Sequence, residues 1–276
     1  MSAFLDEMAA GSRARVSEAV AARSLAELES AARATPAPPP LRLDASGFDL
    51  IAELKLRSPA AGVLVPAGED LAARVTGYAR AGAAAVSVLT EPSRFDGTLA
   101  HLAAAAAALR PRAMPAMRKD FLVDPYQVFE ARAAGAGGVL VILRMLPKAD
   151  TQALLECARS LGLFVLLEAF DTDDLALLHE LVAAHRGPNV LLAGVNCRDL
   201  ATLEVVPSRL LELSSLLPAR VPRVAESGVN STQDARAVAA AGYSLALVGS
   251  ALMRGADSGA LAASLIAAGR AARALG

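Results

Sequence analysis

The residues best suited to chemistry in this sequence form a charged pair at the end of an apolar run. The stretch FDLIAELKLRSPAAG, residues 48–62, begins as a buried β-strand and then places Glu53 and Lys55 two residues apart. Side chains two residues apart in a strand point to the same face. A carboxylate that holds an ammonium group beside a reacting centre is suited to acid–base catalysis, so the pair predicts proton-transfer chemistry.

Other apolar runs of the chain also end in polar or small residues. One such residue alone is most often a solvated loop charge. Several charges buried at one place cost several kcal/mol each unless they are paired, so their convergence would indicate an active site whose pKa values move apart. The residues at these ends are Ser58, Lys119, Glu168, Asn196, Arg198, Glu226, Ser227, Gly249 and Ser250.

A repeat of helix, glycine and strand indicates how these ends are brought together. Helical patterns end at glycines, and a short apolar run follows each of them: Gly82, Gly135, Gly162 and Gly242. Glycine is favoured where a helix ends in a left-handed residue. The separations are close to multiples of about 27 residues, the size of one βα unit.

Strands are therefore predicted near residues 48–54, 84–89, 113–118, 138–143, 164–168, 190–196, 222–226 and 245–249. Most are continuous apolar runs, which is typical of strands covered on both faces. Eight alternating units predict an α/β fold, a (β/α)8 TIM barrel with its site at the C-terminal strand ends. A doubly wound open sheet is the alternative, although no G-x-G-x-x-G follows the first strand.

The chain is expected to form a single domain, residues 1–276. Residues 1–47 form an N-terminal helical extension and a connector, in which ATPAPPP ends the helices because proline cannot continue them. Residues 48–276 form the barrel.

Composition excludes several classes of function. A net charge of −1 argues against nucleic acid or an anionic membrane surface as the main partner. The two cysteines, Cys157 and Cys197, form no CxxC motif, and no signal peptide or membrane-length apolar run is found, so we expect a cytoplasmic protein. No metal-ligand spacing occurs, and the histidines His101, His179 and His185 fall on helices or their ends.

The last two strand ends carry a second signal. ESGV and VGSAL place small residues ahead of helix starts, where backbone N–H groups can bind a phosphate. A small phosphorylated metabolite is the substrate that this pattern predicts.

The longer motifs resemble those of one enzyme family. In order and at matching spacing, the sequence is similar to indole-3-glycerol phosphate synthase in IAELKLRSPAAG, VSVLTEPSRFDGTL, MRKDFLVDPYQVFEARAAGAGGVLVIL, LLEAFDTDDL, GVNCRDLATLEV and VAESGVNSTQDARAVAAAGYSLALVGSALMR. The resemblance covers nearly the whole chain. It implies a decarboxylating ring closure of 1-(2-carboxyphenylamino)-1-deoxyribulose 5-phosphate in tryptophan biosynthesis, without a metal or an organic cofactor.

The same resemblance implies roles for individual residues. It places catalytic groups at Glu53, Lys55, Lys119, Glu168 and Asn196, substrate contacts at Ser58, Phe121, Arg198, Glu226 and Ser227, and phosphate contacts at Lys55, Gly228, Gly249 and Ser250. The chemistry favours Lys119 as general acid, Glu168 for proton transfer and Lys55 as a second acid. Two residues depart from the family pattern, Phe170 and Cys197, and Cys197 is interpreted as a small packing residue.

Alternatives remain at this stage. Other phosphosugar barrels, such as phosphoribosylanthranilate isomerase or the tryptophan synthase α subunit, do not need this combination of charged residues. A third alternative is a non-catalytic barrel that binds a phosphorylated ligand or a partner protein. Such a barrel has no need to keep buried charges, so the charged strand ends argue against it. A monomer is favoured, with a homodimer as the alternative, and a specialised indole pathway is an alternative to primary tryptophan synthesis.

Overall fold

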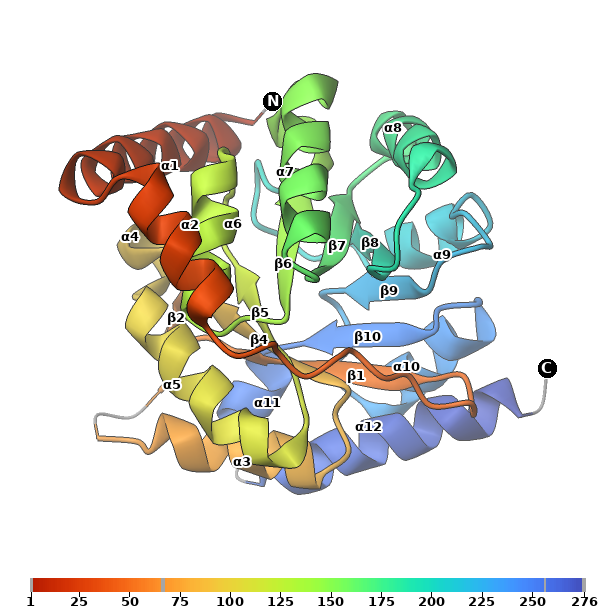
Figure 1. The fold of residues 1–276 in the computed structure, drawn as a ribbon. Helices are drawn as coiled ribbons and strands as arrows, with labels where there is room; N and C mark the ends of the chain where they lie inside the picture. The colour runs from red at the N-terminus through yellow and green to blue at the C-terminus, as the bar shows by residue number, and fades with distance from the viewer. Residues whose placement is uncertain (1, 66–67, 256, 275–276) are drawn as a thin grey trace.

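The computed structural model describes residues 2–65, 68–255 and 257–274. Eight parallel strands close into a barrel in the order β1-β10-β9-β8-β7-β6-β5-β4, and helices surround it (Figure 1). Because β1 pairs with both β4 and β10, the sheet has no open edge. The predicted (β/α)8 barrel is confirmed, and the alternative of an open sheet is wrong.

The barrel strands match the predicted positions closely. They are Asp49–Leu54 (β1), Ala85–Leu89 (β4), Ala116–Lys119 (β5), Gly138–Ile142 (β6), Phe164–Ala169 (β7), Leu191–Asn196 (β8), Arg223–Glu226 (β9) and Leu245–Val248 (β10). The largest difference is at β5, which starts at Ala116 and not at residue 113, because Ala113 is left-handed and ends a short 3-10 turn. A small antiparallel hairpin, Arg57–Ser58 (β2) with Gly62–Val63 (β3), follows β1.

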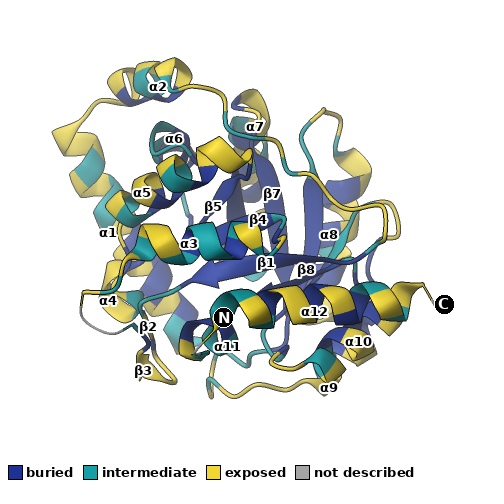
Figure 2. Ribbon diagram, turned by 90° about the horizontal axis from the view of Figure 1, so that it is seen from below, coloured by how far each residue is buried: buried dark blue, intermediate teal, exposed yellow. Residues whose placement is uncertain are grey.

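Helices cover the outside of the barrel, with buried inner faces and exposed outer faces (Figure 2). They are Ala3–Ala22 (α1), Leu25–Ala34 (α2), Leu71–Arg80 (α3), Pro92–Phe95 (α4), Leu99–Leu109 (α5), Pro125–Ala133 (α6), Lys148–Ser160 (α7), Thr172–Ala184 (α8), Ser208–Ser214 (α9), Thr232–Ala240 (α10), Ser250–Arg254 (α11) and Ser258–Arg273 (α12), with 3-10 turns Arg110–Arg112 (η1) and Leu143–Met145 (η2). None of the helices in the described part of the chain has both the length and the apolar character to cross a membrane.

The glycines that were expected to end helices do so. Gly82, Gly135, Gly162 and Gly242 have φ values between +69° and +100°. Each allows the chain to leave a helix in the left-handed conformation and enter the next strand. These turns set the register between each helix and the strand that follows.

The N-terminal extension is helical, as predicted; it consists of the two helices α1 and α2, and α1 contacts the barrel at the ends of β4 and β5. Arg15 of α1 forms ion pairs with Asp120 at 2.8 Å and with Glu91 at 3.5 Å. Asp120 lies between Lys119 and Phe121 in the sequence. The extension therefore holds the end of the strand that carries Lys119.

Candidate active site

A pocket with a volume of about 350 Å³ opens at the C-terminal ends of the barrel strands. It is lined by every residue that the sequence placed at the site: Glu53, Lys55, Ser58, Lys119, Phe121, Glu168, Asn196, Arg198, Glu226, Ser227, Gly228, Gly249 and Ser250. Barrel closure brings these strand ends to one mouth, since all eight strands run parallel. The roles of the individual residues remain predictions.

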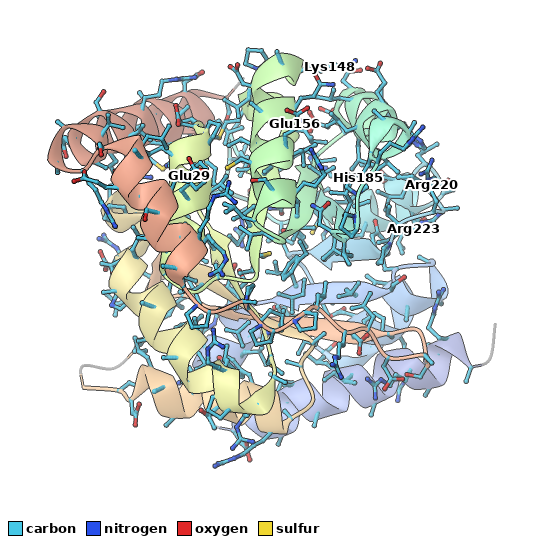
Figure 3. All side chains as sticks on the ribbon, viewed as in Figure 1. Glu29, Lys148, Glu156, His185, Arg220 and Arg223 are labelled. Carbon is cyan, nitrogen blue, oxygen red and sulfur yellow. The ribbon has the colours of Figure 1, made fainter. Side chains whose placement is uncertain are left out.

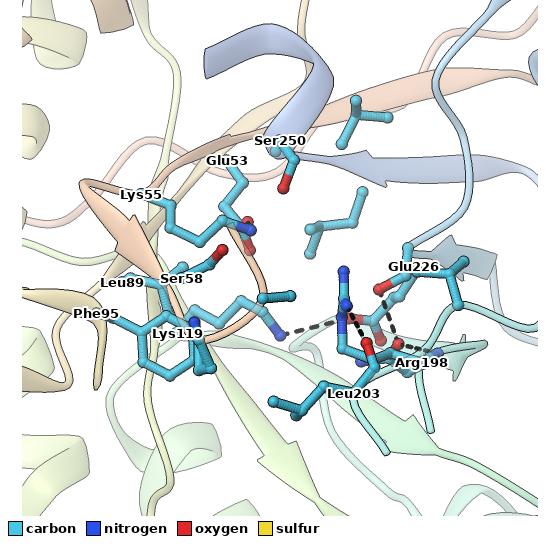
Figure 4. Close-up of a pocket in the computed structure, with 18 of the residues that line it drawn as sticks. Glu53, Lys55, Ser58, Leu89, Phe95, Lys119, Arg198, Leu203, Glu226 and Ser250 are labelled. Carbon is cyan, nitrogen blue, oxygen red and sulfur yellow. Dashed lines mark hydrogen bonds and ion pairs between the residues drawn. The ribbon is translucent and has the colours of Figure 1, made fainter. Parts of the chain in front are cut away.

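Glu53 and Lys55, two residues apart at the end of β1, form an ion pair. Lys55 Nζ donates a hydrogen bond to Glu53 Oε1 at 2.5 Å, and Glu53 is buried (Figure 4). Burial alone would raise the pKa of Glu53, but the charges of Lys55 and Lys119 outweigh it and lower that pKa. Glu53 is thus a carboxylate that holds the Lys55 ammonium group in place.

Lys119 enters the pocket from β5 and meets carboxyl groups from two other strands. Its Nζ lies 3.0 Å from Glu168 Oε2 on β7 and 3.6 Å from Glu226 Oε2 on β9. Burial would lower the pKa of Lys119, yet Glu168, Glu226 and Glu53 raise it above its ordinary value. Lys119 is therefore an ammonium group held between carboxyl groups.

The pKa of Glu226 is shifted in the opposite direction to that of Glu53. Burial and the neighbouring Glu168 carboxylate raise the pKa of Glu226 well above its ordinary value, although Lys119 acts against them. The lowered pKa of Glu53 and the raised pKa of Glu226 agree with the expectation that clustered carboxyl groups move apart.

Asn196 has its amide orientation fixed by the residues that follow β8 and β9. Its Oδ1 accepts hydrogen bonds from Ser227 Oγ and from the Arg198 backbone N–H, both at 2.9 Å. The Nδ2 group then donates to Glu168 Oε1 at 3.0 Å. Ser227 has a φ of +66°, a conformation that costs a non-glycine residue energy and is typical of functional loops.

The small residues predicted to bind phosphate lie at the β9 and β10 ends of the pocket. Ser250 begins α11, and no side chain caps the N-terminus of that described helix, so its backbone N–H groups are open to an anion. Gly249 has a further role, because a Cβ atom there would collide with the Glu53 carboxylate. Arg254, four residues after Ser250, also lines the pocket and was missed in the sequence.

Replacing Gly249 by alanine tests this steric role. The added methyl group is expected to displace the Glu53 carboxylate from Lys55 and to lower kcat/KM by about 10²-fold, the cost of a misplacement of roughly 1 Å at a reacting site. Steady-state kinetics measures the loss. Gly77→Ala in α3 serves as the control, because its added Cβ meets no atom and its backbone is not left-handed. The two variants are compared after circular dichroism has confirmed their fold. Unchanged kinetics in Gly249→Ala would contradict the role.

Three more residues of the site were not predicted from the sequence. A Cβ at Gly194 of β8 would collide with the Glu226 carboxyl group, so glycine makes room for that side chain. A glycine inside a strand pattern is a signal of such close approach. Phe4 and Phe95 line the pocket beside Phe121, and their ring centroids lie 5.9 and 6.2 Å from the Phe121 ring centroid. The three phenylalanines are far apart in the sequence, so no local pattern predicts that they meet.

The two departures from the family pattern lie outside the described pocket lining. Cys197 is fully buried, and burial raises the pKa of its thiol to about 11, so the packing role predicted for it is consistent with its surroundings. Phe170 is also buried, and the Arg144 guanidinium stacks over its ring at 4.7 Å. Arg144 in turn pairs with Asp174 at 2.6 Å.

Other candidate groups lie away from the pocket. His101 is on α5, His179 is on α8, and His185 ends α8 on the outside of the barrel (Figure 3). Among the described residues, no group of His, Cys, Asp and Glu side chains is arranged to hold a metal ion.

Comparisons with known proteins point in one direction. The family model described as Indole-3-glycerol phosphate synthase matches residues 5–265. A protein of that name from Mycobacterium avium (strain 104) is 41% identical over 96% of this chain and 94% of its own length. One from Micrococcus luteus is 45% identical over 77% of this chain and 75% of its own length.

Solved structures share the fold at low sequence identity. The 3-hexulose-6-phosphate synthase from Salmonella typhimurium has a TM-score of 0.61 and 17% identity, covering 80% of this chain and 97% of its own. The tryptophan synthase alpha chain from Legionella pneumophila has a TM-score of 0.53 and 14% identity, covering 88% of this chain and 96% of its own. These similarities support the barrel fold alone.

Proposed function

This chain belongs to the indole-3-glycerol phosphate synthase family, and from that premise we propose how its pocket performs the family's reaction. The protein is an indole-3-glycerol phosphate synthase, a carboxy-lyase of tryptophan biosynthesis. It converts 1-(2-carboxyphenylamino)-1-deoxyribulose 5-phosphate to indole-3-glycerol phosphate, carbon dioxide and water.

Lys119 is the general acid of the ring closure. The aromatic carbon that bears the carboxylate attacks the ketose carbonyl carbon, and the carbonyl oxygen takes a proton from Lys119. The observation that carries this assignment is the Lys119 ammonium group, which is half-buried in the pocket and held charged by the carboxylate of Glu168 at 3.0 Å. Its raised pKa keeps the proton in place until a more basic oxygen forms in the reaction.

Lys55 and Glu168 serve the later steps. The bond to the carboxylate breaks, carbon dioxide leaves, and the electron pair returns to the ring. Lys55, held by Glu53 at 2.5 Å, then protonates the hydroxyl group, which leaves as water. Glu168, oriented by Asn196 at 3.0 Å, removes a proton from the carbon between the nitrogen and the new ring bond, and the indole double bond forms.

The remaining lining residues bind and orient the substrate. Gly228, Gly249 and the N-terminus of α11 at Ser250, together with Lys55, hold the phosphate through backbone N–H groups and one ammonium charge. Polar contacts to the ribulose chain come from Glu226 and from Ser58, Ser227 and Arg198, and the aromatic ring packs against Phe121.

An assay with the phosphorylated substrate tests the proposal. Purified protein is incubated with the carboxyphenylamino-deoxyribulose phosphate, and indole fluorescence is followed with time. Turnover supports the lyase mechanism. No signal at high enzyme concentration would instead favour a non-catalytic barrel, whose binding of the same compound can be measured by calorimetry. Substituted anthranilate analogues in the same assay would separate primary tryptophan synthesis from a specialised indole pathway.

Three further properties complete the proposal. The chain acts as a single domain, which the Arg15 contacts between the N-terminal extension and the barrel support. It works in the cytoplasm, as expected for a biosynthetic enzyme with two free cysteines. It is a monomer, and sedimentation analysis of the purified protein distinguishes this from a homodimer.

A further inference from the structure

We propose that Glu226 enters the reaction as a neutral carboxylic acid and returns a proton to Lys119 after Lys119 has protonated the substrate. This inference rests on the proposed function of the pocket. It gives Glu226 a role in proton supply in addition to the substrate contact that the family resemblance implies.

The charges of the pocket floor leave Glu226 without a cation of its own. Glu53 is paired with Lys55 at 2.5 Å, and Glu168 is paired with Lys119 at 3.0 Å. Both oxygens of Glu168 accept hydrogen bonds, one from Lys119 and one from Asn196, a pattern that suits an ionised carboxylate. A third buried carboxylate in the same place would be an uncompensated charge, which is strongly unfavourable.

In the part of the chain that the structure describes, the Glu226 side chain has no hydrogen-bond donor to stabilise an ionised carboxylate, and it shares its nearest cation, Lys119, with Glu168. It is 1% exposed, and within the described residues neither of its oxygens has a hydrogen-bond partner. Lys119 Nζ lies 3.6 Å from Oε2, beyond hydrogen-bond length. Gly194 of β8 has no side chain, and this leaves the space that the Glu226 carboxyl group occupies beside that strand. A buried carboxyl group without donors is expected to hold its proton.

The groups that face Glu226 come from several strands. Lys119 on β5 favours its ionised form, whereas Glu168 on β7 and Glu53 on β1 oppose it. The flanking strands β8 and β10 pair Asn196 and Leu247 with Glu226, and neither of these side chains titrates. The balance of burial and charge raises the pKa of Glu226.

The reaction needs such a proton. The substrate enters with an ionised carboxylate and leaves as neutral carbon dioxide, water and the indole product, so one proton is taken up in each turnover. Two protons are donated, to the carbonyl oxygen and to the departing hydroxyl group, and only one is recovered from carbon. In a pocket whose floor is buried, a stored proton supplies the difference without admitting water.

The transfer from Glu226 to Lys119 is balanced, and it requires the two side chains to move from 3.6 Å to hydrogen-bond distance. After Lys119 has given its proton to the carbonyl oxygen, it is a neutral amine 3.6 Å from the Glu226 carboxyl group in the present geometry. The O–H bond of Glu226 breaks, an N–H bond forms at Lys119 Nζ, and an ammonium–carboxylate pair results. Glu226 regains its proton from solvent when product leaves, and the proton that Glu168 removed from carbon restores the Lys55 ammonium group, so each turnover takes up one proton.

Infrared difference spectroscopy tests the protonation state directly. The substrate-free enzyme at neutral pH is expected to show the C=O stretching band of a protonated carboxyl group, and Glu226→Gln is expected to lack it. The control is Glu212→Gln, which changes an exposed glutamate of α9 and should retain the band. Absence of the band in the unsubstituted enzyme would overturn the inference, whether or not the enzyme turns over its substrate.

Kinetics tests the relay itself. Glutamine keeps the neutral shape of the acid but has no proton to transfer, so kcat of Glu226→Gln is expected to fall about 10²-fold with KM within roughly threefold of its original value. The decline of kcat/KM as pH rises through the raised pKa of Glu226 should also disappear. A large rise in KM with unchanged kcat would show that Glu226 only binds substrate, and loss of the band without loss of kcat would equally reject the relay.

Discussion

Replacing Lys119 by methionine is expected to lower kcat by about 10³–10⁴-fold, the upper range for loss of a positioned proton donor. Methionine has a similar length and no charge, so the pocket keeps most of its packing while the carbonyl oxygen loses its acid. The loss should exceed that of any other substitution described for this pocket, because Lys119 contacts both Glu168 and Glu226. Indole fluorescence under saturating substrate measures kcat.

The control is the remaining lysine of the chain. Lys148 lies at the exposed start of α7 (Figure 3), where it pairs with Glu180 at 2.5 Å. Lys148→Met is expected to leave kcat within twofold, because exposed pairs contribute about 0–1 kcal/mol to stability and this pair lies outside the pocket lining. Near-normal turnover by a folded Lys119→Met enzyme would reject Lys119 as the general acid.

Replacing Asp120 by alanine is expected to lower the free energy of unfolding by about 3–5 kcal/mol, the usual cost of breaking a buried ion pair. The Asp120 side chain is fully buried. It accepts hydrogen bonds from Arg118, Arg15 and Thr90 and from the backbone of Phe121. Its removal leaves the Arg118 guanidinium, which is 4% exposed, without one of its two carboxylate partners. Urea unfolding followed by circular dichroism measures the change.

Glu29→Ala is the matched control, since Glu29 pairs with Arg33 on the exposed face of α2 and such pairs contribute about 0.3–0.5 kcal/mol. A loss in Asp120→Ala no larger than in Glu29→Ala would contradict the buried role of Asp120.

The effect of Asp120→Ala should also depend on pH in a defined direction. Burial would raise the pKa of Asp120, but Arg118 and Arg15 outweigh it and lower that pKa. A carboxyl group whose pKa is lower in the folded state than its unfolded value of about 3.9 stabilises the protein above that value. The stability difference between the two proteins is therefore expected to be full near neutral pH and to shrink as pH falls below about 4.

Local patterns in the sequence were enough to predict the barrel and the set of side chains at its mouth. Strand periodicity and the glycines that end helices are local properties, and each repeat carries them within about 27 residues. The position of Glu53 or Lys119 at the end of a strand is fixed by the same local pattern. For this reason every predicted site residue lines one pocket.

The contacts between these residues could not be predicted from local patterns, because they form when the barrel closes. Lys119, Glu168 and Glu226 come from strands β5, β7 and β9, and their distances depend on closure of the whole barrel. The contacts of Arg15 with Asp120, and the room that Gly194 gives Glu226, likewise join segments with no local relation. Charge balance in a buried site depends on the number and distance of all neighbours. The sequence supplied three carboxyl groups, and packing determined which one, among the described residues, has no hydrogen bond to a lysine.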